Sequence, residues 1–62
     1  MAWIKHDGLA INLDRVQTFW WEREDTFRGH LYLRYDPDNV VKIEDRFETL
    51  HRRALLACGL PI

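Results

Sequence analysis

The adjacent tryptophans in Thr18–Glu24, TFWWERE, restrict how this chain can fold more than any other feature. The stretch is rich in β-branched and aromatic residues, which suit a half-buried strand. Successive side chains of a strand point to opposite faces of a sheet, so Trp20 and Trp21 cannot enter the same core. Phe19 shares a face with Trp21, whereas the face of Trp20 ends in a charge. We therefore predict that Phe19 and Trp21 face a helix-covered core and that Trp20 lies on the outer face; a bulge near Gln17 would reverse this.

The spacing of apolar residues and turn signals predicts further strands around this stretch. In total we expect strands at about residues 2–5, 10–12, 16–24, 27–35 and 40–44. Within residues 27–35, Leu31, Leu33 and Tyr35 alternate with polar or charged neighbours, which is the period of a strand. Gly29 interrupts this pattern and indicates a bulge or a close approach of another group to the backbone.

The sequence DPDN at Asp36–Asn39 predicts the turn between the last two strands. A four-residue loop would place Leu33 opposite Lys42, on the same face. A loop over residues 36–40, or an equivalent bulge, places Leu33 opposite Ile43 instead. We favour the second register because it brings apolar side chains together.

The clearest predicted element is a C-terminal helix over about residues 46–58. Asp45 is a suitable N-cap, and Glu48 completes a capping-box pattern. Gly59 suits the left-handed position that follows a helix. An apolar stripe at helical spacing is expected to face the core. Its residues are Phe47, Leu50, Ala54, Ala57 and Cys58, with Leu55 on its flank.

Together these elements predict one α+β domain spanning residues 1–62. We expect a small antiparallel β-meander of three long strands, with one or two short N-terminal strands, packed on one face by the single helix. A chain of 62 residues has a small core and often needs an additional source of stability. Cys58 is the only cysteine, so a disulfide within the chain is excluded and self-association remains open.

Charge and hydropathy restrict the partners and the cellular compartment that we expect for this chain. The net charge is −1, from 9 basic and 10 acidic residues, and a dedicated nucleic-acid-binding protein usually carries a basic excess. The longest uncharged apolar run, Ala54–Cys58, is too short to span a bilayer. The first residues, MAWIKHDG, lack the apolar core of a signal peptide. A lone cysteine without an export signal favours a reducing, cytoplasmic setting.

Four segments in order carry a resemblance to known proteins. They are INLDRV (Ile11–Val16), LYLRY (Leu31–Tyr35), VVKIED (Val40–Asp45) and the terminal helix. In this arrangement the chain resembles small, uncharacterised bacterial proteins built as a β-meander with a C-terminal helix. The resemblance covers most of the chain and implies a fold and a bacterial origin. It implies no catalytic or binding residue.

The residue types that usually carry chemistry are dispersed. His6, His30 and His51 lie on three different expected elements without metal-ligand spacing, so we interpret them as surface or rim histidines. Cys58 lies at the end of the helix on the apolar stripe, where a small buried side chain is the expected role. The chain contains no serine and no glycine-rich phosphate loop. The acidic residues near the turns are expected to be solvated. We therefore predict no catalytic residue, no cofactor and no metal.

The outer sheet face offers the strongest candidate site. Trp20, His30, Tyr32 and Arg34 are expected to share it, and a single helix cannot cover both faces of a sheet. Monomers rarely leave such an aromatic area bare, and interface centres favour aromatic residues and arginine. We predict a non-enzymatic, homo-oligomeric interaction module, most simply a dimer joined through its sheets, with a different protein as another possible partner. The alternative is a single-stranded nucleic-acid-binding module, in which the aromatic side chains stack on bases.

Overall fold

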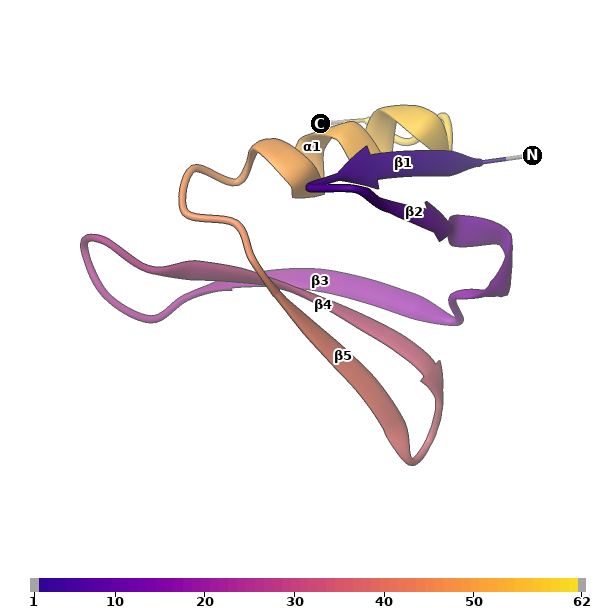
Figure 1. Cartoon of the computed structure of the whole chain (residues 1–62), viewed down its shortest axis with the longest axis horizontal. Helices are drawn as coiled ribbons and strands as arrows, with labels where there is room; N and C mark the ends of the chain where they lie inside the picture. Colours follow the sequence, from indigo (N-terminus) through magenta and orange to yellow (C-terminus); the bar gives the residue numbers. More distant parts are fainter. Residues whose placement is uncertain (1, 62) are drawn as a thin grey trace.

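The structure, a computed structural model, describes residues 2–61 and confirms the predicted α+β class. Two antiparallel sheets precede one C-terminal helix (Figure 1). The elements are β1 (Trp3–His6), β2 (Leu9–Asn12), the short 3₁₀ helix η1 (Leu13–Arg15), β3 (Thr18–Arg23), β4 (Gly29–Asp36), β5 (Asn39–Glu44) and α1 (Thr49–Ala57). The strands therefore lie where the sequence placed them, although their ends differ by one or two residues.

The three-stranded sheet has the order β3-β4-β5 and is antiparallel throughout. Phe19 pairs with Leu33 and Trp21 with Leu31, so these four side chains share the inner face. Trp20 pairs with Tyr32 on the opposite, outer face. The prediction that Phe19 and Trp21 face the core while Trp20 faces outward is confirmed. Because the register is continuous from Thr18 to Arg23, no bulge reverses it.

The turn between β4 and β5 differs from the predicted one. Leu33 lies opposite Val41, and Leu31 lies opposite Ile43, so the predicted pairing of Leu33 with Ile43 is wrong. The loop is shorter than predicted because Asp36 pairs directly with Asn39. A register shift between Arg34 and Asp36 then changes the pairing of the residues before it, so that Leu33 does not lie opposite Lys42. This irregularity acts as the bulge that the apolar pattern required. Apolar side chains consequently still share the inner face.

The two short N-terminal strands form a separate hairpin that lies on the inner face of the larger sheet. Its turn uses Asp7 and Gly8, both with positive φ (47° and 79°). The hairpin and α1 lie on the same side of β3–β5 (Figure 1). The inner face is therefore covered by the helix together with β1 and β2, and the helix does not cover it alone.

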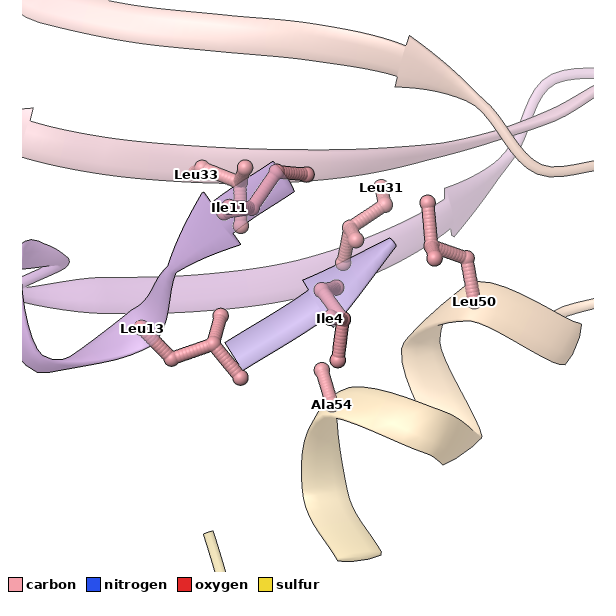
Figure 2. Packing of buried hydrophobic residues seen from close by; sticks show 7 residues of the cluster. All are labelled: Ile4, Ile11, Leu13, Leu31, Leu33, Leu50 and Ala54. Carbon is pink, nitrogen blue, oxygen red and sulfur yellow. The ribbon is translucent and has the colours of Figure 1, made fainter. Parts of the chain in front are cut away.

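The core lies between the hairpin, the helix and the inner face (Figure 2). Leu31 and Leu33, from the central strand β4, have no exposed surface. The buried apolar residues are Ile4, Ile11, Leu13, Leu31, Leu33, Leu50 and Ala54. Phe19, Tyr35 and Ile43 pack against this cluster while remaining partly exposed. Burial of these side chains is the main favourable contribution to folding.

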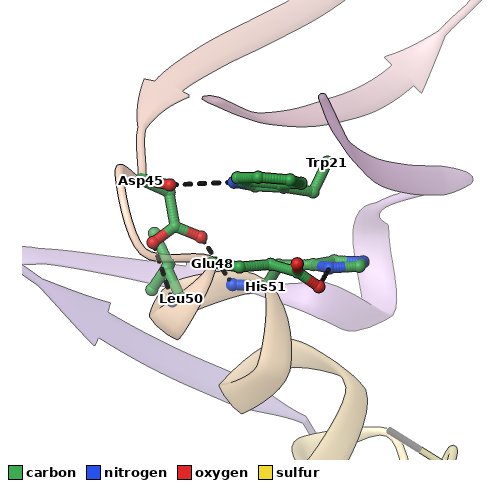
Figure 3. A network of polar contacts seen from close by, with 5 residues as sticks. All are labelled: Trp21, Asp45, Glu48, Leu50 and His51. Carbon is green, nitrogen blue, oxygen red and sulfur yellow. Dashed lines mark hydrogen bonds and ion pairs between the residues drawn. The ribbon is translucent and has the colours of Figure 1, made fainter. Parts of the chain in front are cut away.

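The start of the helix corrects the capping prediction. Glu48, and not Asp45, is the N-cap residue, and its backbone is left-handed (φ 61°, ψ 15°). Asp45 nevertheless satisfies the helix start, because its carboxylate accepts hydrogen bonds from the backbone N–H groups of Leu50 (3.0 Å) and His51 (2.8 Å) (Figure 3). The chain makes an additional turn after β5, closed by the bond from Glu48 N–H to the Asp45 carbonyl (3.2 Å). The helix therefore begins at Thr49, later than predicted.

The end of the helix confirms one prediction and corrects another. Gly59 is left-handed (φ 73°), and the N–H groups of Gly59 and Leu60 bond to the carbonyls of Leu56 (3.0 Å) and Leu55 (2.9 Å). This is the hydrogen-bond pattern of a Schellman motif. The predicted apolar stripe is only half right, since Leu50 and Ala54 are buried but Phe47, Ala57 and Cys58 are exposed. A helix of 9 residues that rests mainly on β1 buries a narrower stripe than the sequence suggests.

Candidate interaction surface on the outer sheet face

Among residues 2–61, no helix or strand covers the outer face of β3–β5 (Figure 1). Strand pairing arranges its side chains in three rows across the sheet. The arginine end consists of Thr18, Arg34 and Val40. The aromatic centre consists of Trp20, Tyr32 and Lys42. The glutamate end consists of Glu22, His30 and Glu44.

The aromatic centre is built on a direct stack. The rings of Trp20 and Tyr32 lie 5.2 Å apart between centroids, with an interplanar angle of 6°. Cationic groups lie against both rings: the Arg34 guanidinium is 5.4 Å from the Trp20 ring centre, and the Lys42 ammonium is 5.9 Å from that of Tyr32. Such cation–π contacts orient long side chains and rings relative to one another. The result is a pair of stacked rings with a cationic group against each of them.

Lys42 is held in place by Glu24, which follows β3. Its ammonium lies 2.7 Å from Glu24 Oε1. The hydrogen bond from Lys42 is the main cause that lowers the pKa of Glu24. Burial opposes it, and the charges of His30, Lys42 and Arg28 add to the lowering. The same hydrogen bond raises the pKa of Lys42. Both groups therefore remain charged through the neutral range and neutralise each other locally.

His30 is a largely enclosed polar side chain of this surface. Only 14% of its side chain is exposed, and Glu24 Oε1 lies 3.0 Å from its Nδ1. The direction of approach does not satisfy a hydrogen bond, so the buried Nδ1 has no hydrogen-bond partner among residues 2–61. Its cross-strand neighbours are Glu22 and Glu44, and the Tyr32 ring lies 6.4 Å away. His30 therefore has one carboxylate in contact, that of Glu24, and a glutamate at the paired position of each neighbouring strand.

The charges divide the outer face into two unlike ends. Arg34 is the only charged residue of the arginine end, whereas Glu22 and Glu44 flank His30 at the other. Within these three rows, with Lys42 paired to Glu24, the remaining positive charge lies at one end and the remaining negative charges lie at the other. A surface with this pattern is complementary to a copy of itself turned end for end.

The structure brings the four residues of the predicted patch, Trp20, His30, Tyr32 and Arg34, onto one face. The sequence also predicts Glu22 on the face of Trp20, although Glu22 is not counted in the predicted patch. Lys42 and Glu44 were not assigned to this face, although a strand period of two places both of them there. Glu24 follows the end of β3, and the bond from its N–H to the Arg28 carbonyl (2.9 Å) continues the strand register. The period of two therefore places it on the same face, but its contacts with His30 and Lys42 depend on its side-chain conformation.

The other candidate residues lie apart from this surface. His6 lies on β1, 3.5 Å from Asp7, and His51 on α1 contacts Glu48 (3.0 Å). Cys58 is a free, exposed thiol, so its predicted burial is wrong. Across residues 2–61, no group of three or more potential metal ligands converges and no pocket is present.

A second exposed aromatic group lies at the loops near the start of α1. The Arg46 guanidinium lies 5.1 Å from the ring centre of Phe27 and 4.8 Å from that of Phe47. The two rings are 65% and 70% exposed. Both loops contain acidic and basic residues, so no single sign of charge indicates what would bind there.

Comparisons with protein-family models, with curated proteins and with solved structures found no match to this chain. None of the helices in residues 2–61 has the length and apolar character needed to cross a membrane.

Proposed function

We propose that this chain is a non-enzymatic interaction module that forms a homodimer through the outer face of its three-stranded sheet. The observation that carries the proposal is the uncovered stack of Trp20 on Tyr32, flanked by charges of opposite sign at the two ends of the strands. Stacked aromatic rings are costly to leave against water, and aromatic residues with arginine are typical of interface centres. A free thiol at Cys58 is compatible with a reducing compartment such as the cytoplasm.

The charge pattern selects one orientation of the two copies. If the strands of the two sheets run in opposite directions about a two-fold axis across the aromatic centre, each arginine end meets the partner's glutamate end. Arg34 then lies between the partner's Glu22 and Glu44, and the Trp20–Tyr32 stacks meet in the middle. If the strands run in the same direction, like rows meet and Arg34 faces the partner's Arg34. Complementary charges therefore favour the antiparallel sandwich, in which sheets pack with roughly aligned strands.

The same face is less suited to single-stranded nucleic acid. Trp20, Tyr32 and Arg34 could stack on bases, but Lys42 is neutralised by Glu24 and the glutamate end is negative. Nucleic-acid grooves depend on uncompensated positive charge along the phosphate backbone. We therefore favour a second copy of the chain as the occupant of this surface.

The test is a charge exchange followed by sedimentation velocity at neutral pH. The wild-type chain is expected to form a dimer at micromolar concentration. Arg34→Glu should weaken the dimer by at least about tenfold, because three like charges then meet at each end of the interface. Adding Glu22→Lys and Glu44→Lys to Arg34→Glu should restore dimerisation. Arg53→Glu, an identical charge change on the exposed side of α1, is the matched control and should leave the dimer intact.

Each result bears on a different part of the proposal. A wild-type monomer at all accessible concentrations would overturn dimerisation. A dimer that is insensitive to Arg34→Glu would exclude the antiparallel orientation. Salt-sensitive quenching of tryptophan fluorescence by mixed-sequence oligonucleotides, abolished by Tyr32→Ala, would replace the proposal with nucleic-acid binding.

A further inference from the structure

We infer that His30 makes the proposed dimer sensitive to pH, so that protonation of its imidazole favours the separate chains. This inference rests on the antiparallel sheet-to-sheet dimer proposed above. It explains why a nearly enclosed imidazole, with its Nδ1 lacking a hydrogen bond, is placed at the centre of the glutamate end. Unsatisfied buried polar atoms are rare in folded proteins and often mark functional positions.

In the single chain, carboxylates outnumber cations around His30. Glu24 lies 3.0 Å from Nδ1, and Glu22 and Glu44 are its cross-strand neighbours on β3 and β5. The cations at this end are Lys42, which is bound to Glu24, and Arg28, whose charge also acts on Glu24. The remaining ionisable group nearby is Tyr32, whose ring lies 6.4 Å away. Protonated His30 therefore faces more negative than positive charge and retains some contact with water.

Formation of the antiparallel dimer makes the surroundings of His30 less favourable to a positive charge. The row that meets the glutamate end contains the partner's Arg34 between uncharged side chains, so His30 gains a cation and no additional carboxylate. Pairing also removes water from the face, which disfavours the charged imidazole. Both effects weaken proton binding in the dimer relative to the single chain. By linkage, protons must then weaken the dimer by the same factor.

The experiment is sedimentation equilibrium of the wild-type chain across the histidine range, from about pH 8 to about pH 5.5. The dimer dissociation constant should rise by about tenfold or more as the pH falls, since each dimer contains two copies of His30 and each unit of pKa difference contributes a factor of ten. His30→Gln keeps a neutral polar side chain of similar reach, and its dissociation constant should remain constant over the same range. His6→Gln removes a histidine from β1, outside the outer face, and should retain the full pH dependence.

The outcomes separate this inference from the proposal on which it rests. A dimer at high pH with a dissociation constant that does not change with pH would overturn the role of His30 and leave the dimer intact. A pH dependence that persists in His30→Gln, or disappears in His6→Gln, would also overturn it. A chain that is monomeric even at about pH 8, where histidines are neutral, would overturn the proposed dimer itself.

Discussion

The inner and outer faces of the three-stranded sheet come from the same strands, yet they differ in almost every physical property. On the inner face, Leu31 and Leu33 are completely buried beneath the hairpin and α1. On the outer face, Trp20 and Tyr32 stack on each other and remain partly exposed, surrounded by charged groups. A step of one residue along a strand therefore separates side chains that are buried in the core from side chains that no element of residues 2–61 covers.

The difference is not uniform along the sheet. Val41 lies in an inner-face position opposite Leu33, but it is 43% exposed. The hairpin and helix lie over β3 and β4, whereas β5 projects away from them (Figure 1). The inner face is consequently a strong contributor to stability over the central strand and a weaker one at the β5 edge.

The largest difference in the effect of a substitution on stability is expected between two neighbouring residues of β4, Leu33 and Tyr32. Leu33→Ala should lower the free energy of unfolding by about 3 kcal/mol, because it leaves a cavity in the core. For a domain of this size, such a loss is close to the whole stability. Tyr32→Ala should cost less than about 1 kcal/mol in the single chain, as expected for a surface substitution.

Urea unfolding followed by circular dichroism, at concentrations too low for association, measures both values. Leu33→Val provides an intermediate core change and should fall between wild type and Leu33→Ala. If Tyr32→Ala destabilises the single chain as much as Leu33→Ala does, the outer face belongs to the core and the contrast between the faces is wrong.

Substitution of Gly29, on the inner face, is expected to reduce stability by less than Leu33→Ala does. A Cβ at this position would overlap the Trp21 indole, reaching within 2.9 Å of its Cε2 atom, and would lie 3.1 Å from the Asp45 carbonyl oxygen. The indole is fixed there by the hydrogen bond that its Nε1–H donates to the same carbonyl (2.8 Å) (Figure 3). Gly29→Ala should therefore reduce stability by about 2 kcal/mol through overpacking.

A double-mutant cycle with Trp21→Leu separates this clash from the effect of glycine on the backbone. In the Trp21→Leu background, Gly29→Ala should cost clearly less, because the ring that it meets is gone. Equal costs in the two backgrounds would show that the close approach of Trp21 does not determine the residue at position 29.

The sequence predicted the two faces because strand alternation depends on local chain geometry alone. It placed Phe19 and Trp21 inside and Trp20 outside, and Gly29 indicated the close approach that Trp21 makes. It could not predict the start of α1, since that depends on an additional turn in which Asp45 reaches past Glu48 to the helix. Strand alternation also places Glu24 on the outer face, but its contacts with His30 and Lys42 depend on side-chain conformation, which the sequence pattern does not predict.

The smallest effect is expected at the outer face, from the ion pair between Glu24 and Lys42. Lys42 lowers the pKa of Glu24 through a hydrogen bond, so this carboxylate stabilises the fold above the pKa it has in the unfolded chain. That contribution disappears as the pH falls through the still lower folded value. Since both side chains are substantially exposed, at 49% for Lys42 and 36% for Glu24, the contribution is small.

The contribution of this ion pair is tested by measuring the thermal unfolding midpoints of dilute wild type and Glu24→Gln at neutral and acidic pH. The wild type should be slightly more stable at neutral pH, and the two midpoints should converge in acid because protonated Glu24 no longer differs in charge from glutamine. Glu22→Gln, which removes a carboxylate outside this ion pair, is the control for a general charge effect. A difference that persists in acid would show that Glu24 acts through packing, and the outer face would then contribute to folding by the same means as the inner one.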